Sequence, residues 1–200
     1  GIPGNSGQRY AIFPEQGLVA YGNSSHAGVG LSIGTNGVSV FEHSADYLAS
    51  TLVQATNLTG WQHIALVYST VLGVRAPKLY LNGGLVRTGL ASAKIVHPSV
   101  NLGEAGFGYG HYQGQVDEVR VWKIAMDKQT LLDWRDRELN PSHPYYASLV
   151  GYWRLNEGAG VLAGDSSGRA NQGWLTNGPA WVTPGAPITG WGDPIVRADS

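Results

Sequence analysis

The 200-residue chain has no cysteine, few charged residues and no long apolar run. The absence of cysteine excludes disulfides, thiolate metal sites and cysteine nucleophiles. Charged residues make up only 14% of the chain, and Lys and Arg never form a run, so the sequence lacks the basic patch that phosphate binding requires. No stretch reaches the ~18–20 apolar residues that span a bilayer. These absences argue against nucleic acid and against membrane insertion.

What the chain does contain is typical of many short strands joined by tight turns. It has 29 Gly and 10 Pro, together with 7 Trp and 10 Tyr that can fill a core. Asn-Gly between alternating apolar runs is a strong hairpin signal, and it occurs at Asn36-Gly37 and Asn82-Gly83. The pattern predicts an all-β, antiparallel two-sheet sandwich.

The predicted strands alternate apolar and polar or small residues over short runs. Asp127 is a candidate N-cap for one short helix, which Pro141 and Pro144 would stop. Four tryptophans are predicted to lie mostly in the core: Trp122, Trp153, Trp174 and Trp181. The clearest strands are expected at residues 9–13, 29–33, 38–42, 61–68, 78–81, 85–87, 115–122 and 149–155.

Three ordered motifs and one C-terminal block carry a family resemblance. The motifs are Trp61-Gln-His-Ile-Ala65, Leu79-Tyr-Leu-Asn-Gly83 and Gly114-Gln-Val-Asp-Glu-Val-Arg-Val-Trp122. The block runs from Leu149 to Trp181. Together they resemble the laminin-G-like and pentraxin-like domains of the concanavalin A superfamily, from about Gly28 to Val182. The resemblance implies a jelly-roll sandwich with one short helix after the Asp117-Glu118 strand.

The resemblance also suggests a domain organisation. We expect residues 1–183 to form a single sandwich that segment 149–182 closes, and residues 184–200 to form a Pro/Gly-rich tail. The alternative is that the segment opens a second, truncated repeat. The chain starts Gly1-Ile2-Pro3-Gly4 without signal-peptide features, as expected for part of a larger protein.

The loop from Gly103 to Gly114 is the best candidate for ligand binding. Its aromatic side chains alternate with glycines, which lets the backbone approach a ligand while aromatic faces are displayed for a sugar ring. The alternative is that Phe107 and Tyr112 plug the edge of the sandwich. The candidate ligand-binding residues are Glu104, Phe107, Tyr109, His111 and Tyr112.

A second loop could hold a structural calcium ion. Calcium prefers six to eight oxygen ligands from carboxylates, amides and backbone carbonyls. Asp165, Ser167 and Asn171 offer such groups beside Gly168, and members of the resembling family often hold calcium near loops of this kind. The alternative is an Asx or ST turn, in which Asp165 bonds its own backbone. The loop before the Asp117-Glu118 strand is poor in acids, which argues against a pentraxin-type double calcium site.

Catalysis is not expected. Hydrolases of this fold carry a Glu-x-Asp-x-x-Glu pattern that puts two carboxylates on one strand face, and the chain has no Glu-x-Asp. On an extended strand, Asp117 and Glu118 would point to opposite faces. His63 is expected to be a satisfied core histidine rather than a base.

The sequence therefore predicts a non-catalytic binding module, secreted or on the cell surface, that recognises carbohydrate or a surface protein through its rim loops. One alternative is a structural or adhesive spacer with protein partners. Another is a hydrolase with an unrecognised site. The sequence does not indicate an oligomeric state.

Overall fold

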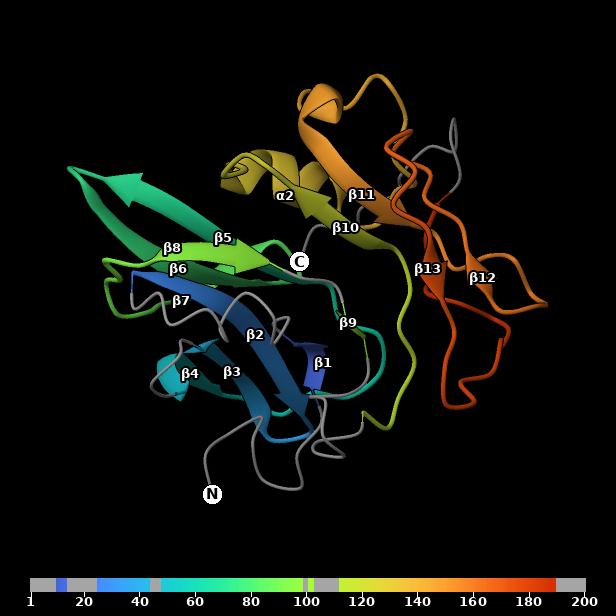
Figure 1. Cartoon of the computed structure of the whole chain (residues 1–200), viewed down its shortest axis with the longest axis horizontal. Helices are drawn as coiled ribbons and strands as arrows, with labels where there is room; N and C mark the ends of the chain where they lie inside the picture. Colours follow the sequence, from blue (N-terminus) through green and yellow to red (C-terminus); the bar gives the residue numbers. More distant parts are fainter. Residues whose placement is uncertain (1–9, 14–24, 44–47, 99–100, 103–111, 190–200) are drawn as a thin grey trace, which may run out of the picture. The chain divides into compact units, whose positions relative to one another are not determined.

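The structure is a computed structural model that describes residues 10–13, 25–43, 48–98, 101–102 and 112–189 (Figure 1). The chain divides into two compact units, Gly1–Gly114 and Gln115–Ser200. The described residues are mostly strands in antiparallel sheets with one short α-helix, so the all-β sandwich prediction is confirmed.

The first unit contains a six-stranded and a three-stranded sheet. The larger sheet has the order β4-β3-β2-β1-β9. β8 pairs in parallel with the first residues of β2, and β1 pairs in antiparallel with later residues of the same strand. The smaller sheet has the order β5-β6-β7. The larger sheet's strands are β1 (Tyr10–Phe13), β2 (His26–Gly34), β3 (Gly37–His43), β4 (Leu48–Ala55), β8 (Ile95–Pro98) and β9 (Asn101–Leu102). The smaller sheet's strands are β5 (Ile64–Val71), β6 (Val74–Leu81) and β7 (Gly84–Thr88).

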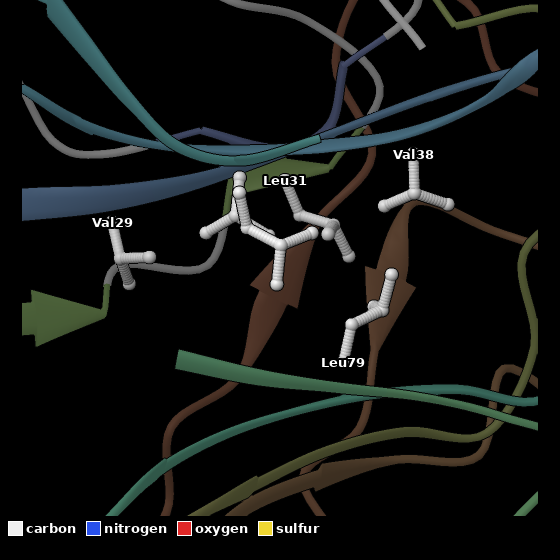
Figure 2. Packing of buried hydrophobic residues seen from close by; sticks show 6 residues of the cluster. Val29, Leu31, Val38 and Leu79 are labelled. Carbon is white, nitrogen blue, oxygen red and sulfur yellow. The ribbon is translucent and has the colours of Figure 1, made fainter. Parts of the chain in front are cut away.

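A hydrophobic core joins the two sheets of this unit. Alternate residues of β2 and β3, among them Val29, Leu31 and Val38, point toward Leu79 of β6 (Figure 2). Ile64 and Leu66 of β5 pack against the same cluster. Period-two alternation therefore puts one apolar face of each sheet against the other, as a sandwich requires.

On the outer face of the larger sheet, Gly30 and Phe41 form a cross-strand pair. A Cβ at Gly30 would lie 2.1 Å from the Phe41 ring, so only glycine leaves room for the ring to cover the sheet.

The predicted hairpins form. Asn82 and Gly83 join β6 to β7 with φ values of 50° and 79°, the two positive values that a type I′ turn requires. The other hairpin differs by one residue: Gly34 pairs with Gly37, so Thr35 and Asn36 form the loop and Gly37 follows it.

The second unit contains two short antiparallel strand pairs and the helix. β10 (Val119–Trp122) pairs with β11 (Leu149–Trp153), and β12 (Leu162–Ala163) pairs with β13 (Gly173–Trp174). The helix α2 spans Lys128–Trp134, and a 3-10 turn, η1, spans Tyr146–Ser148. Asp127 caps the helix as predicted, accepting a hydrogen bond from the Thr130 backbone N–H at 2.9 Å.

Two predicted strands begin later in the structure, and the strand predicted over 149–155 ends earlier, at Trp153. The strand predicted over 61–68 begins at Ile64. The strand predicted over 115–122 begins only at Val119 because Glu118 adopts φ 52°, outside the extended region. The helix ends at Trp134, well before Pro141.

The prediction that segment 149–182 closes the sandwich stays a prediction. Within the second unit, β11 of this segment pairs with the strand that follows Asp117-Glu118. The start of the predicted tail is hydrogen-bonded to the rest of the second unit. Ala186 donates its backbone N–H to the Asp117 carboxylate at 2.7 Å, and Thr189 donates its backbone N–H to the Asp136 carbonyl at 2.8 Å.

Candidate ligand-binding site

The rim loop predicted from sequence falls mostly outside the described residues. Glu104, Phe107, Tyr109 and His111 lie there, so their role stays a prediction. Tyr112 is half-buried, and burial raises the pKa of its phenol. A Cβ at Gly114 would lie 2.7 Å from the Tyr112 hydroxyl oxygen, so Gly114 makes room for this hydroxyl.

Trp174 is the most exposed tryptophan of the described residues, with 69% of its surface accessible. The prediction that it lies in the core is wrong. Its cross-strand partner in β12 is Leu162, which is 40% exposed. The two side chains form an apolar platform on the outer face of the β12–β13 hairpin, and we call this pair the Trp174 platform.

The inner face of the same hairpin holds the platform in place. Ala163, paired with Gly173, is buried and packs against Trp153 in a core cluster with Val119. A Cβ added at Gly173 would lie 3.6 Å from the Trp153 ring, so Gly173 also faces this ring. Since successive strand residues face opposite sides, packing Ala163 and Gly173 inward directs Leu162 and Trp174 outward. The exposed Gln172 and Thr176 flank Trp174 in the chain and add polar groups.

The other predicted core tryptophans are less exposed than Trp174. Trp153 is buried, and Trp181 packs against its cluster. Trp122 packs against the neighbouring cluster formed by Leu139, Leu149 and Tyr152.

The loop predicted to hold calcium is folded around Asp165. One carboxylate oxygen accepts the backbone N–H groups of Tyr152 and Ser167, both at 2.9 Å. The other accepts the Ser167 hydroxyl and the Asn171 N–H, both at 2.8 Å. Burial raises the pKa of Asp165, but these hydrogen bonds outweigh burial and lower it overall.

The three predicted calcium ligands therefore lie close together. Their hydrogen bonds are those of an Asx or ST turn, which the sequence offered as the alternative to a calcium site. Asn171 also ties the loop to β11, because its side-chain amide donates to the Val150 carbonyl at 2.8 Å. No group of three or more His, Asp or Glu side chains in the described part of the chain could hold a metal ion. Calcium at this loop stays a prediction.

Asp117 and Glu118 serve different partners. Asp117 accepts the backbone N–H groups of Glu118 and Ala186. Glu118 accepts the Arg120 guanidinium at 2.5 Å and the Tyr152 hydroxyl at 2.7 Å. The Glu118 carboxylate raises the pKa of Tyr152 further, beyond the larger effect of burial. Both acids thus stabilise the local fold of the second unit.

The first unit holds a buried carboxylate that sequence analysis missed. Glu42 is 3% exposed and accepts hydrogen bonds from Tyr68 at 3.2 Å and from the Ser92 hydroxyl at 2.6 Å. Burial, followed by the Glu42 charge, raises the pKa of Tyr68. The signal was available: Glu42 continues the alternation of Val38 and Val40, which both face the core.

No helix among the described residues is both long and apolar enough to cross a membrane.

Comparison with known proteins gives one match. The laminin G family model of the concanavalin A-like lectin/glucanases superfamily matches residues 5–131, which include all three motifs but not the block that starts at Leu149. Searches of curated proteins and of solved structures give no match. The match covers more than half of the chain and agrees with the sandwich of strands described above. The chain therefore belongs to the laminin G group of the concanavalin A-like lectin/glucanases superfamily.

Proposed function

We propose that this protein is a non-catalytic, extracellular or cell-surface module that binds carbohydrate, with the Trp174 platform as part of its contact surface. The family supports a ligand-binding module in general. The observation that carries the finer proposal is the exposure of Trp174 beside Leu162 on a hairpin whose inner face is packed. Laminin G-like domains are typically extracellular, which supports the proposed location.

Carbohydrate suits this surface for a physical reason. A sugar ring has one apolar face of C–H groups that can stack on an indole, and hydroxyls at its edge that need hydrogen-bond partners. Trp174 supplies a large aromatic face, and the exposed Gln172 and Thr176 supply polar groups next to it in the chain. Such a hairpin needs no rearrangement to present the indole, so little entropy is lost on binding.

Four described carboxylates of the second unit support the non-catalytic part of the proposal. Retaining glycosidases need two carboxyl groups ~5–5.5 Å apart across the sugar bond. Asp117 and Glu118 hold different partners, and Asp165 accepts four hydrogen bonds. Glu138 pairs with Arg154. Each of these acids is engaged with groups of the fold itself.

The test is a glycan array followed by titration with the glycans that bind. A Trp174→Ala variant should lose at least about tenfold in affinity, because truncating an aromatic anchor costs well over 1 kcal/mol of binding energy. Its melting temperature should change little, because Trp174 is mostly exposed. Trp61→Ala is the matched control, since Trp61 is the other exposed tryptophan of the described residues, at 37%. Equal affinity of the Trp174→Ala and wild-type proteins would reject the platform.

The rim loop is tested in the same assay. Tyr109→Ala and Tyr112→Ala should weaken glycan binding and leave the melting temperature nearly unchanged. A large fall in stability would instead assign these side chains to packing.

A structural calcium ion at Asp165, Ser167 and Asn171 is part of the proposal. If it binds, a chelator lowers the melting temperature of the wild type, and Asp165→Ala removes that response. A wild type that ignores the chelator, or a variant that responds equally, would reject the site.

Protein binding is a second candidate function, favoured by one observation. The β5–β6 hairpin ends in Leu72, which is 98% exposed, and Val74 beside it is also exposed. An apolar tip of this kind suits an adhesive module with a protein partner. It is favoured if Leu72→Asn, and not Trp174→Ala, abolishes attachment to a surface that carries the partner.

A further inference from the structure

Two histidine rings meet between neighbouring strands of the first unit. His26 Nδ1 lies 2.6 Å from His97 Nε2, and the ring planes differ by 13°. The ring centroids are 4.9 Å apart, which equals the distance between the two nitrogens plus the distance from each nitrogen to the centre of its own ring. The two centroids and the two nitrogens therefore lie nearly on one line. The rings therefore lie end to end in nearly one plane, with these two nitrogens facing each other.

The register of the strands explains why these rings meet. β8 runs parallel to β2, and His97 pairs with Gly28. His26 is two residues before Gly28, so it lies on the same face of β2. Gly28 has no side chain, which leaves space above the strand for both rings. On the other side of β2, the same register row continues to His43 of β3.

Two facing ring nitrogens at this distance have either a proton or a metal ion between them. In the hydrogen bond, one ring donates its N–H to the other. A metal ion can take the place of that proton, because the proton can move to the outer nitrogen of the same ring and leave two lone pairs free. Imidazole nitrogen suits Zn²⁺, Ni²⁺ and Cu²⁺, whereas Ca²⁺ prefers oxygen.

We propose that His26 Nδ1 and His97 Nε2 bind a divalent transition-metal ion, with water completing its coordination. With metal–nitrogen distances of ~2.0–2.1 Å, the two nitrogens must separate to about 2.9 Å for a right angle and about 3.3 Å for a tetrahedral one. Small ring rotations achieve this, because both histidines are only half-buried. The affinity order should follow Zn²⁺ < Cu²⁺ and Ni²⁺ < Cu²⁺. The proposal does not rest on carbohydrate binding.

The binding test uses the full chain without a histidine tag, after removal of metals with a chelator. Calorimetric titration with ZnCl₂, NiCl₂ and CuCl₂ should show one site per chain, and thermal melts should show a raised melting temperature. CaCl₂ should produce neither effect at this site. His26→Gln and His97→Gln should each weaken binding at least tenfold, because losing even a residue that only supports a metal ligand typically costs about 10–100-fold in affinity. His63→Gln is the matched control and should bind like the wild type.

A second measurement does not depend on how the variants fold. The electron paramagnetic resonance spectrum of the wild type with one equivalent of Cu²⁺ should show splitting from at least two equivalent imidazole nitrogens. His43→Gln tests whether a third histidine contributes, and would lower the nitrogen count if it does. The proposal is overturned if no ion binds at the 1:1 level, if binding survives in the His26→Gln/His97→Gln double variant, or if the pair alters stability with pH alone and never with metal.

Discussion

Leu72 lies at the first position of the β5–β6 turn, with φ at 52° and almost its whole surface in water. The left-handed region is unfavourable for a residue with a Cβ, and exposing an apolar side chain gives no compensating burial. The other two-residue turn of this sheet has Asn82 at the equivalent position, with φ 50°. Asn tolerates this conformation because its side chain can bond the local backbone.

Replacing Leu72 by Asn should therefore stabilise the protein, by about 0.5–1 kcal/mol. Denaturant unfolding at constant pH measures the change. Leu72→Ala is the control, because it removes the exposed apolar group but keeps the conformational strain, and it should leave stability nearly unchanged. If Ala stabilises as much as Asn, the conformation is not the cause.

His143 is a residue whose environment makes stability depend on pH. It is 3% exposed, stacks on Trp122 with centroids 4.6 Å apart, and accepts the Tyr145 backbone N–H on Nδ1 at 3.0 Å. Burial, followed by the positive charge of Arg120, lowers the pKa of His143 to about 4.

Because the unfolded chain binds this proton near pH 6.5 and the folded chain only near pH 4, His143 stabilises the fold less as pH falls between these values. The loss is at most about 3 kcal/mol. Urea unfolding at pH 7.5, 5.5 and 4.5 measures it, and His143→Asn, whose Oδ1 can replace Nδ1 as acceptor, should flatten the slope. An unchanged slope in the variant would assign the pH dependence to other groups.

At the scale of elements, local signals were predicted well and short elements poorly. Asn82-Gly83 and the Asp127 cap were found because both depend on residues adjacent in the chain. Trp174 was misplaced because β12 and β13 have two residues each, too few to show alternation. The later start of the strand at Glu118 was not predicted. The Glu118 carboxylate accepts hydrogen bonds from Arg120 and Tyr152, and an alternating sequence pattern does not reveal these partners.

Loss of the turn around Asp165 should weaken the second unit. Its carboxylate holds N–H groups from β11 and from the loop itself, so Asp165→Asn leaves part of this set without an acceptor. We expect a loss of about 1–3 kcal/mol in the free energy of unfolding at pH 7. Because the folded pKa of Asp165 is lowered, the difference from wild type should be complete above the ordinary carboxyl pKa near 4 and should shrink as pH falls below it toward the lower folded pKa. A difference independent of pH would contradict this account.

Two arrangements of the molecule predict different unfolding behaviour. Segment 149–182 either closes one sandwich or belongs to a second unit that unfolds separately. The chain carries two matched probes. Tyr68 donates its hydroxyl to Glu42 in the first unit, and Tyr152 donates to Glu118 in the second. Removing either hydroxyl leaves a carboxylate with one donor fewer, which costs about 1–3 kcal/mol.

If residues 1–183 unfold as one domain, calorimetry of the full chain shows a single transition, and both Tyr68→Phe and Tyr152→Phe lower its midpoint. For a domain of this size each kcal/mol corresponds to about 2–4 °C. The calorimetric and van't Hoff enthalpies should also agree, since a cooperative domain has no populated intermediate. Two transitions, each shifted by only one of the two substitutions, would instead mean that the units fold separately and that the C-terminal segment does not complete the sandwich.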